Sequence, residues 1–368
     1  MNSLLLILII VILIPCFIAT MFVPYWTRKT ESFGVSIPAS VYHQPKLQQM
    51  RKKYVLQTGI LSVIITISIL LSGSVWQDEN VISLILGGAI SIYLLVSFVL
   101  YIRFHREMKQ LKAENKAWSE RSQLVVMDTK FRDQKLTYSN LWFSISFIIA
   151  LLTAAWTLIN YDKLPARIPM QYDFSGEVTN WSEKSYRSAF LMPIMQVYLT
   201  LLFIFINTII AKAKQQVSAV NTESSVIQNI IFRRRWSLFI IITGTAMALL
   251  FAFIQLSLFY PVNTTLMLVL PLAISIGITI GAIILSITTG QGGSRLKVQG
   301  KDNAGEIIDR DDDRYWKLGI FYFNRNDPAI FLEKRFGVGW TNNWAHPLSW
   351  IFLLVIIGLA IGIPLILG

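Results

Sequence analysis

The sequence predicts an all-α integral membrane protein, with a bundle of about eight transmembrane helices, one short structured external loop and a cytoplasmic, aromatic-rich tail segment. Three observations predict this class. Hydrophobic residues make up 54% of the 368 residues and charged residues only 15%, and the mean hydropathy is +0.54. A soluble domain carries roughly a quarter charged residues. This composition therefore argues against a cytosolic enzyme.

Eight apolar stretches are long enough to cross a bilayer, because about 20 helical residues span roughly 30 Å of hydrocarbon. None of them contains Asp, Glu, Lys or Arg. They are residues 3–23, 54–74, 81–102, 138–159, 189–211, 236–259, 265–287 and 348–367. The first stretch lacks the basic start and the small-residue cleavage site of a signal peptide, so we expect a retained helix.

Basic residues are concentrated in every second one of the segments that connect these stretches. Of the 33 Lys and Arg residues, 29 fall in the segments 24–53, 103–137, 212–235 and 288–347. The positive-inside rule makes these segments cytoplasmic and both termini extracytoplasmic. We therefore expect a multi-pass protein of the plasma membrane, with the lipid bilayer as a partner.

The spans divide the chain into five expected parts. These are an N-terminal four-helix membrane region (1–159), an extracytoplasmic loop (160–188), a three-helix membrane region (189–287), a cytoplasmic tether with an aromatic and basic segment (288–347), and a last membrane helix (348–368).

Residues that commonly bind metals are scarce. The chain has one cysteine, Cys16, and three histidines, so we expect no metal site, no cofactor and no disulfide framework. The net charge of +12 is explained by cytoplasmic loops, and no recognition fold accompanies it, so we expect no nucleic-acid partner. No nucleophile accompanies the carboxylates, so we predict no catalytic residues and no enzyme.

The intramembrane polar side chains that are candidates for a functional role are Gln196, Asn207 and Gln255. The simplest interpretation is interhelical hydrogen bonding, worth about 0.5–2 kcal/mol each. A polar conduit through the same residues is the alternative.

The cytoplasmic segments carry simpler expectations. Residues 103–116 have mixed charge and predict a solvated extension of the third helix. Three consecutive arginines, residues 233–235, precede the sixth span, which is typical of a topology anchor.

Residues 288–347 do not have the residue spacing of a phosphate loop, a dinucleotide fingerprint or a calcium loop, so we expect a flexible, solvated tether. Their aromatic residues predict a surface on the inner leaflet, with a small aromatic core as the alternative. A cytoplasmic protein partner is left open.

The external loop carries the candidate binding residues. Pro165 and Pro169 predict extended backbone, and Gly176 predicts a turn. The predicted ligand-binding set combines backbone constraint, aromatic surface and opposite charges: Pro165, Pro169, Tyr172, Asp173, Gly176, Glu177, Trp181 and Lys184. The partner expected there is an extracellular peptide or a lipid.

The stretch "LPARIPMQYDFSGEVTNWSEK" resembles the extracytoplasmic signature of an uncharacterised bacterial membrane domain family, which also occurs in immunity proteins against the sporulation-delaying peptide toxin. The matching residues are Leu164, Pro165, Ile168, Pro169, Tyr172, Asp173, Gly176, Glu177 and Lys184. Family members commonly carry His where this chain has Gln171, so the resemblance implies no proton or metal role there.

Two further stretches carry weaker resemblances. Residues 311–350 resemble the cytoplasmic domain of unknown function that accompanies the first in such proteins. "ESFGVSIP", residues 31–38, is similar to a loop of the immunity proteins, and its Phe-Gly-Val recurs at residues 336–338.

Three functions are consistent with these features. The first is a binding or sensing protein whose external loop meets an envelope-active peptide or lipid, giving immunity or signalling. The second is a permease for an uncharged or amphipathic substrate that passes near Gln196, Asn207 and Gln255. The third is an envelope enzyme that uses Asp162, Asp173, Glu177 or Glu183 as acid and base.

Overall fold

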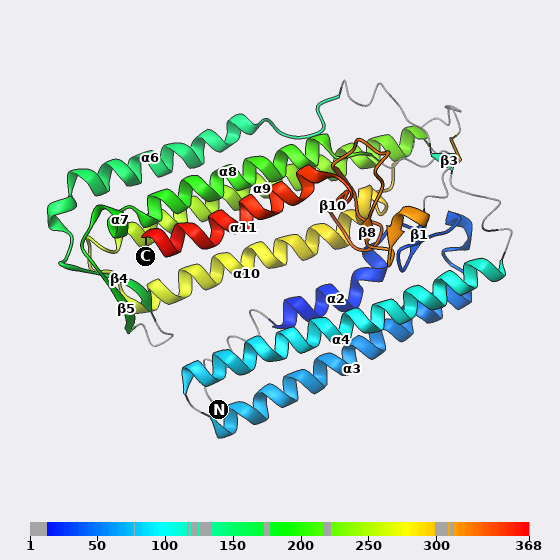
Figure 1. Cartoon of the computed structure of the whole chain (residues 1–368), viewed down its shortest axis with the longest axis horizontal. Helices are drawn as coiled ribbons and strands as arrows, with labels where there is room; N and C mark the ends of the chain where they lie inside the picture. The colour runs from blue at the N-terminus through cyan, green and yellow to red at the C-terminus, as the bar shows by residue number, and fades with distance from the viewer. Residues whose placement is uncertain are drawn as a thin grey trace. The chain divides into compact units, whose positions relative to one another are not determined.

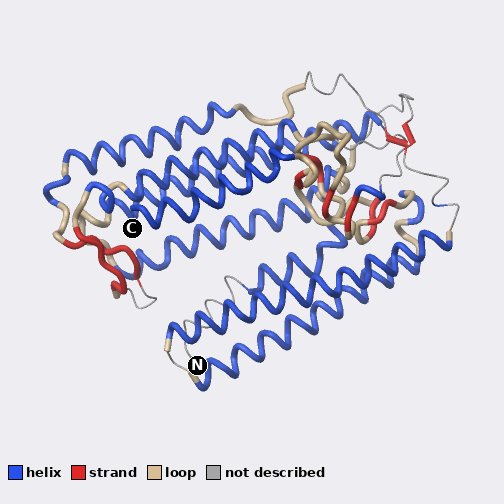
Figure 2. Tube along the Cα trace, viewed as in Figure 1, coloured by secondary structure: helices blue, strands red, loops and turns tan. Residues whose placement is uncertain are grey.

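The structure is a computed structural model of the chain (Figures 1 and 2). It describes residues 13–76, 78–115, 118, 124–125, 134–172, 177–215, 222–298, 308–309 and 313–367. The chain divides into two compact units. Unit 1 comprises Met1–Gln134, Ala213–Phe232 and Ala282–His346, and unit 2 comprises Lys135–Lys212, Arg233–Gly281 and Pro347–Gly368.

Unit 1 is built on a hairpin of two long helices with a third helix packed against it (Figure 1). These helices are α3 (Pro45–Val75), α4 (Glu79–Glu114) and α2 (Ile14–Trp26). Pro45 opens α3 because the first helical residue needs no N–H partner. The buried Tyr93 of α4 joins the three helices, since its hydroxyl lies 3.2 Å from Ser62 Oγ and its ring centroid 4.6 Å from that of Phe17.

Short strands complete unit 1. They are β1 (Glu31–Ser32), β2 (Val35–Ser36), β3 (Leu124–Val125), β6 (Ile308–Asp309), β7 (Trp316–Lys317), β8 (Phe321–Tyr322), β9 (Phe331–Glu333) and β10 (Trp340–Asn342). They pair antiparallel as β1 with β2, β3 with β6, β7 with β8, and β9 with β10.

Unit 2 is helical, apart from one β-hairpin. Its elements are α6 (Ser144–Ile159), β4 (Arg167–Tyr172), β5 (Val178–Glu183), α7 (Tyr186–Ala189), α8 (Leu191–Lys212) and α11 (Pro347–Leu367). The helices α9 (Thr222–Leu256) and α10 (Thr264–Thr289) contribute residues to both units. Close packing is visible at Gly244, where an added Cβ would lie 3.1 Å from the rings of Phe143 and Phe203.

Six helices in the described part of the chain are long and apolar enough to cross a membrane. They are Pro45–Val75, Val81–Glu114, Asn140–Ile159, Leu191–Lys212, Ser224–Leu256 and Thr264–Gly293. Two shorter apolar helices, Ile14–Trp26 and Pro347–Ile363, coincide with the first and last predicted spans. Residues 1–12 lie outside the described residues. The expected total of eight spans therefore stays a prediction.

Two helices are longer than their apolar stretches. α4 continues to Glu114, so the predicted helical extension of the third helix is confirmed, but it is not solvated on all sides, because Phe104, Met108 and Lys112 are buried. α9 begins at Thr222, fourteen residues before the predicted start at 236. The arginine triplet is therefore helical. Arg233 is fully buried, and its Nη1 donates to Ile210 O at 2.6 Å, near the end of α8. An arginine can satisfy carbonyls that a helix C-terminus leaves open, so this residue has a structural role besides any effect on topology.

Candidate functional site

The hairpin β4–β5 contains most of the residues that the sequence predicts as binding residues. Its register pairs Arg167 with Glu183 and Pro169 with Trp181, with an irregularity after Pro169. A two-stranded sheet consists of edge strands, where a proline without an N–H donor is tolerated. The predicted extended conformation of this stretch is confirmed.

One face of the hairpin is fixed by an apolar cluster. Leu164 and Ile168 are buried together with Ala189 of α7, and Met170 and Phe259 pack against them. Burying a large aliphatic side chain contributes about 1.5–3 kcal/mol. The hairpin is therefore held against the ends of helices in the same unit.

The base of the hairpin is closed by Lys184. Its Nζ donates to the carbonyls of Asp162 and Leu164, both at 3.2 Å, and lies 4.9 Å from the centre of the Tyr161 ring. A carbonyl pair and an aromatic face together satisfy an ammonium group. The contacts of Lys184 are thus those of a residue that holds the hairpin base.

The hairpin also carries exposed aromatic side chains. Trp181 is 51% exposed and Tyr172 is 42% exposed, and Glu177 is exposed as well. Partial burial raises the pKa of the Tyr172 hydroxyl above its ordinary value. Exposed aromatic side chains with a polar rim are typical of contact sites for other molecules.

The structure brings the predicted residues into two groups. One group is exposed and consists of Pro165, Tyr172, Glu177 and Trp181. The other group is half-buried and consists of Pro169 and Lys184. Asp173 and Gly176 lie outside the described residues, so the turn expected at Gly176 stays a prediction.

The three intramembrane amides are buried and hydrogen-bonded. Gln196 Nε2 donates to Ala248 O at 2.7 Å, Asn207 Nδ2 to Asn140 Oδ1 at 2.7 Å, and Gln255 Nε2 to Ala189 O at 3.0 Å. Gln196 and Gln255 also lie 3.4 and 3.0 Å from hydroxyls of α6, those of Thr153 and Thr157. The amides therefore connect separate elements of unit 2, as the simpler interpretation expects.

We expect Gln196→Leu and Gln255→Leu to change the stability of the purified protein little. Each variant loses interhelical bonds worth about 0.5–2 kcal/mol and gains an apolar side chain of similar size. Thermal unfolding and a functional assay on the full chain check this expectation. Loss of function at unchanged stability from either variant would contradict it.

The tail segment, residues 313–346, is folded. Trp316, Tyr322 and Leu332 form a buried cluster, so the described residues favour the small aromatic core, which was the alternative expectation. The expected flexible tether is wrong for residues 290–295. Gln291 is fully buried there, and it exchanges two hydrogen bonds with Gly339, at 2.9 Å and 2.7 Å. Residues 299–307 lie outside the described residues.

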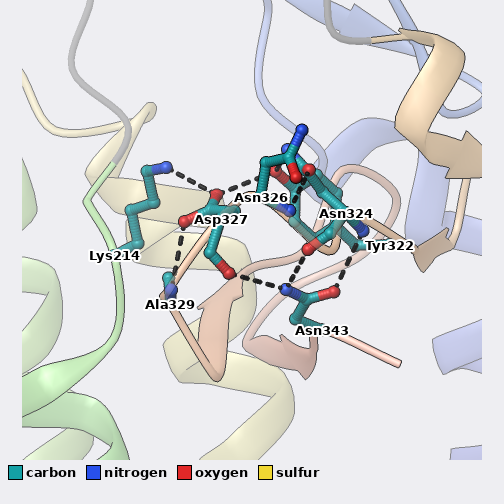
Figure 3. Close-up of polar contacts among 7 residues, drawn as sticks. All are labelled: Lys214, Tyr322, Asn324, Asn326, Asp327, Ala329 and Asn343. Carbon is teal, nitrogen blue, oxygen red and sulfur yellow. Dashed lines mark hydrogen bonds and ion pairs between the residues drawn. The ribbon is translucent and has the colours of Figure 1, made fainter. Parts of the chain in front are cut away.

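Asp327 organises one end of the tail segment (Figure 3). Its Oδ2 accepts from Lys214 Nζ at 2.6 Å and from the Tyr322 hydroxyl at 2.8 Å, and its Oδ1 accepts from Ala329 N at 3.0 Å. Asn343 Nδ2 donates to the Asp327 carbonyl at 3.1 Å. Burial opposes ionisation of this carboxyl, but the hydrogen bonds outweigh burial and hold its pKa below its ordinary value.

Two further carboxylates connect the tail segment to the rest of unit 1. Asp313 pairs with Lys112 at 2.6 Å and with Arg335. Glu333, which is fully buried, pairs with Arg28, and its Oε1 accepts from Asn229 Nδ2 at 2.8 Å.

The charge on Asp313 is stabilised in the folded state. Burial raises its pKa, but Arg335 and Lys112 outweigh burial, so the net pKa lies below the ordinary value. This stabilisation is present above the usual carboxyl pKa of about 4 and is lost as the pH falls through the lowered pKa.

The two Phe-Gly turns of the sequence lie together in unit 1. The rings of Phe33 and Phe336 are stacked with centroids 5.9 Å apart, and Gly34 and Gly337 have φ of +77° and +92°. Phe33 also stacks on Phe104 at 5.2 Å. Both copies of the tripeptide thus contribute to one aromatic core, whereas the sequence alone showed only that the tripeptide recurs.

Among the described residues, no group of three or more His, Cys, Asp or Glu side chains is placed to hold a metal ion. The carboxylates of the tail segment that are placed in the structure are engaged by basic side chains or amides. Their arrangement supports folding of the segment, and the hairpin is the better candidate for contact with another molecule.

Fold and composition together define a multi-pass α-helical membrane protein. Two family models match parts of it. A domain of unknown function, DUF1648, matches residues 148–197, and a family of unknown function, DUF5808, matches residues 325–350. No curated protein and no solved structure is significantly similar to the chain.

The two matches coincide with the two sites described above. The first spans most of α6, the hairpin, α7 and the start of α8. The second spans Asp327, Glu333 and the Phe336 turn. Both are consistent with a membrane protein assembled from domains whose function is not established.

Proposed function

We propose that this protein is a binding or sensing protein of the plasma membrane, in which the hairpin β4–β5 contacts an envelope-active peptide or lipid on the extracytoplasmic side. The contact confers immunity to that molecule or signals its presence. The observation that carries the proposal is that Tyr172 and Trp181 are both exposed on a hairpin that an apolar cluster around Leu164 and Ile168 holds in place.

A fixed hairpin favours binding, because its aromatic groups are already ordered and lose little conformational entropy on contact. Aromatic side chains bury large apolar areas, and they dominate the energetics of many interfaces. The resemblance of Leu164–Lys184 to the loop of the toxin-immunity proteins supports a peptide as the partner.

The test compares Trp181→Ser with Trp142→Ser in the full chain. Trp142 is a matched control, since it is 54% exposed and lies before α6, away from the hairpin residues. We expect Trp181→Ser to lower survival under a panel of envelope-active peptides, and to weaken peptide binding by about tenfold, at unchanged protein abundance. A hot-spot aromatic contributes more than 1 kcal/mol, and 1.4 kcal/mol is a factor of ten.

A second variant separates binding from folding. Lys184→Met removes the ammonium group that binds two carbonyls at the hairpin base. This variant should lower the abundance of the protein as well as its protection against the peptides. If Trp181→Ser and Tyr172→Ser both protect as well as the parent, the hairpin is a structural cap and the sensing role is wrong.

The proposal also requires the hairpin to face outward. In a Cys16→Ser background, a cysteine at Thr179 should react with an impermeant maleimide in intact cells, and one at Ser294 should react only after lysis. The reason is the positive-inside distribution of Lys and Arg. Labelling at Ser294 in intact cells would reverse the orientation.

A permease is the second candidate function. It is favoured by one observation: the side-chain oxygens of Gln196, Asn207 and Gln255 are buried and accept no hydrogen bond from the described residues. Such oxygens could line a path for an uncharged polar substrate. The Gln→Leu variants above test it, because only a transport role predicts loss of function at unchanged stability.

A further inference from the structure

An apolar groove of about 640 Å³ lies within unit 1 against α2 and α3. Its apolar part is formed by Ile18, Phe22, Val55, Leu56 and Ile287. Phe22, Leu56 and Ile287 are exposed although each carries a large hydrophobic side chain. Pockets of about 300–1,000 Å³ are typical of small-ligand sites.

The two helices run antiparallel along the groove. An added Cβ at Gly59 would lie 3.1 Å from Met21 Cε, whereas the Arg51 guanidinium lies 5.9 Å from the Tyr25 ring centre. As the residue number rises from 21 to 25 along α2, the number of the neighbouring residue on α3 therefore falls from 59 to 51. Lys52 is consequently level with Tyr25, and Leu56 lies about one helical turn deeper.

Two cations mark one end of this groove. Lys52 and Arg295 line it, both are exposed, and neither forms an ion pair with a described residue. The Arg295 guanidinium is oriented by two backbone carbonyls, since Nη1 donates to Ile287 O at 3.2 Å and Nη2 donates to Tyr25 O. An arginine has five N–H donors, so donors remain for an anion.

The cationic end coincides with the limit of the apolar sequence. The predicted spans end at residue 23, begin at 54 and end at 287. Tyr25 and Lys52 lie just outside the first two limits, and Arg295 reaches the third through its hydrogen bond to Ile287 O. Tyrosine, tryptophan and basic residues collect at the headgroup level of a bilayer. The groove therefore runs from headgroup level into the acyl-chain region.

We propose that this groove binds one anionic phospholipid of the membrane, with an acyl chain along Phe22, Leu56 and Ile287 and the phosphate between Lys52 and Arg295. Basic pockets between membrane helices bind anionic headgroups in this way. The occupant must combine a phosphate with a long apolar chain, because the site offers two uncompensated cations directly beside apolar side chains. This site shares no residue with the hairpin and does not depend on the proposed sensing role.

The experiment measures lipid retention by the purified full-length protein with native mass spectrometry, titrating phosphatidylglycerol and phosphatidylcholine separately. The variants are Lys52→Gln and the matched control Lys53→Gln, whose lysine is the exposed neighbour that does not line the groove. We expect phosphatidylglycerol to be retained in preference to phosphatidylcholine. Lys52→Gln should weaken its binding about fivefold, since a basic residue near the surface contributes about 1 kcal/mol.

Two further measurements test the acyl-chain part and the headgroup part of the proposed site separately. Leu56→Trp should obstruct the acyl part and lower phosphatidylglycerol retention, with thermal unfolding used to confirm that the variant is folded. Glycerol phosphate, which has the headgroup chemistry without the chain, should not compete at equal concentration. Equal loss from Lys52→Gln and Lys53→Gln, equal retention of the two lipids, or full competition by glycerol phosphate would each overturn the proposal.

Discussion

Replacing Glu333 with Gln is expected to destabilise the protein by up to about 3–5 kcal/mol, because the variant removes the buried carboxylate that pairs with Arg28 and leaves the nearby Glu31 to compensate that charge in part. The hydrogen bond from Asn229 can persist, since the glutamine keeps an oxygen at the same position. The loss is therefore a loss of charge compensation. The measurement is thermal unfolding of the purified full chain, in which each kcal/mol shifts the midpoint by about 2–4 °C for a domain of 150–250 residues.

The control for this prediction is Glu107→Gln, a removal of charge on the exposed face of α4. It should shift the midpoint little, because exposed ion pairs contribute only about 0–1 kcal/mol. The double variant Arg28→Met, Glu333→Met removes both charges and should be more stable than either single Met variant. If the double loss equals the sum of the single losses, the two side chains are not coupled and the prediction fails.

Replacing Gly34 with Ala should be similarly damaging, by about 2–5 kcal/mol. Gly34 has φ of +77°, where an L side chain is strained by about 1–2 kcal/mol. The added Cβ would also lie 2.6 Å from Gly319 O and from the Tyr101 hydroxyl. Relieving that overlap moves backbone, so a further 1–3 kcal/mol for overpacking applies. Lower thermal stability and faster proteolysis of the tail segment are the expected results.

Gly339→Ala separates the two causes. Gly339 also has positive φ, +113°, but nothing lies within 4 Å of its ideal Cβ. It should therefore show the conformational penalty without the overlap. Equal destabilisation by the two alanine variants would show that close packing at Gly34 contributes nothing.

The positions of most helices could be predicted from the sequence, because an apolar run long enough to span a bilayer has few alternative structures. The extent of α9 could not. Its apolar window starts after the arginine triplet, and the buried Arg233 is accommodated by carbonyls of Ile210 and Ala211, which belong to a different helix. Helical periodicity carries no information about such a partner.

The fold of the tail segment could be predicted from the sequence even less well. Its strands are two or three residues long, too short for an alternating pattern to register. Its aromatic residues gave two interpretations, surface or core, and only the contacts of Trp316 and Tyr322 separate them. For the hairpin, the prolines predicted extended backbone, but the role of Lys184 depended on carbonyls twenty or more positions earlier.

The contacts between the first loop and the tail segment have a consequence for biosynthesis. Gly337 N donates to Thr27 Oγ1 across 310 positions of the chain, and Ser36 N donates to Asp313 across 277. At about 5–20 residues per second, a ribosome takes roughly 15–60 s to travel that distance. During that time Arg28 and Lys112 lack the tail-segment carboxylates, Glu333 and Asp313, with which they pair in the folded protein. Glu333 and Asp313 are therefore not yet synthesised while the intervening helices are being made. These two ion pairs therefore form late, only after the tail segment has been synthesised.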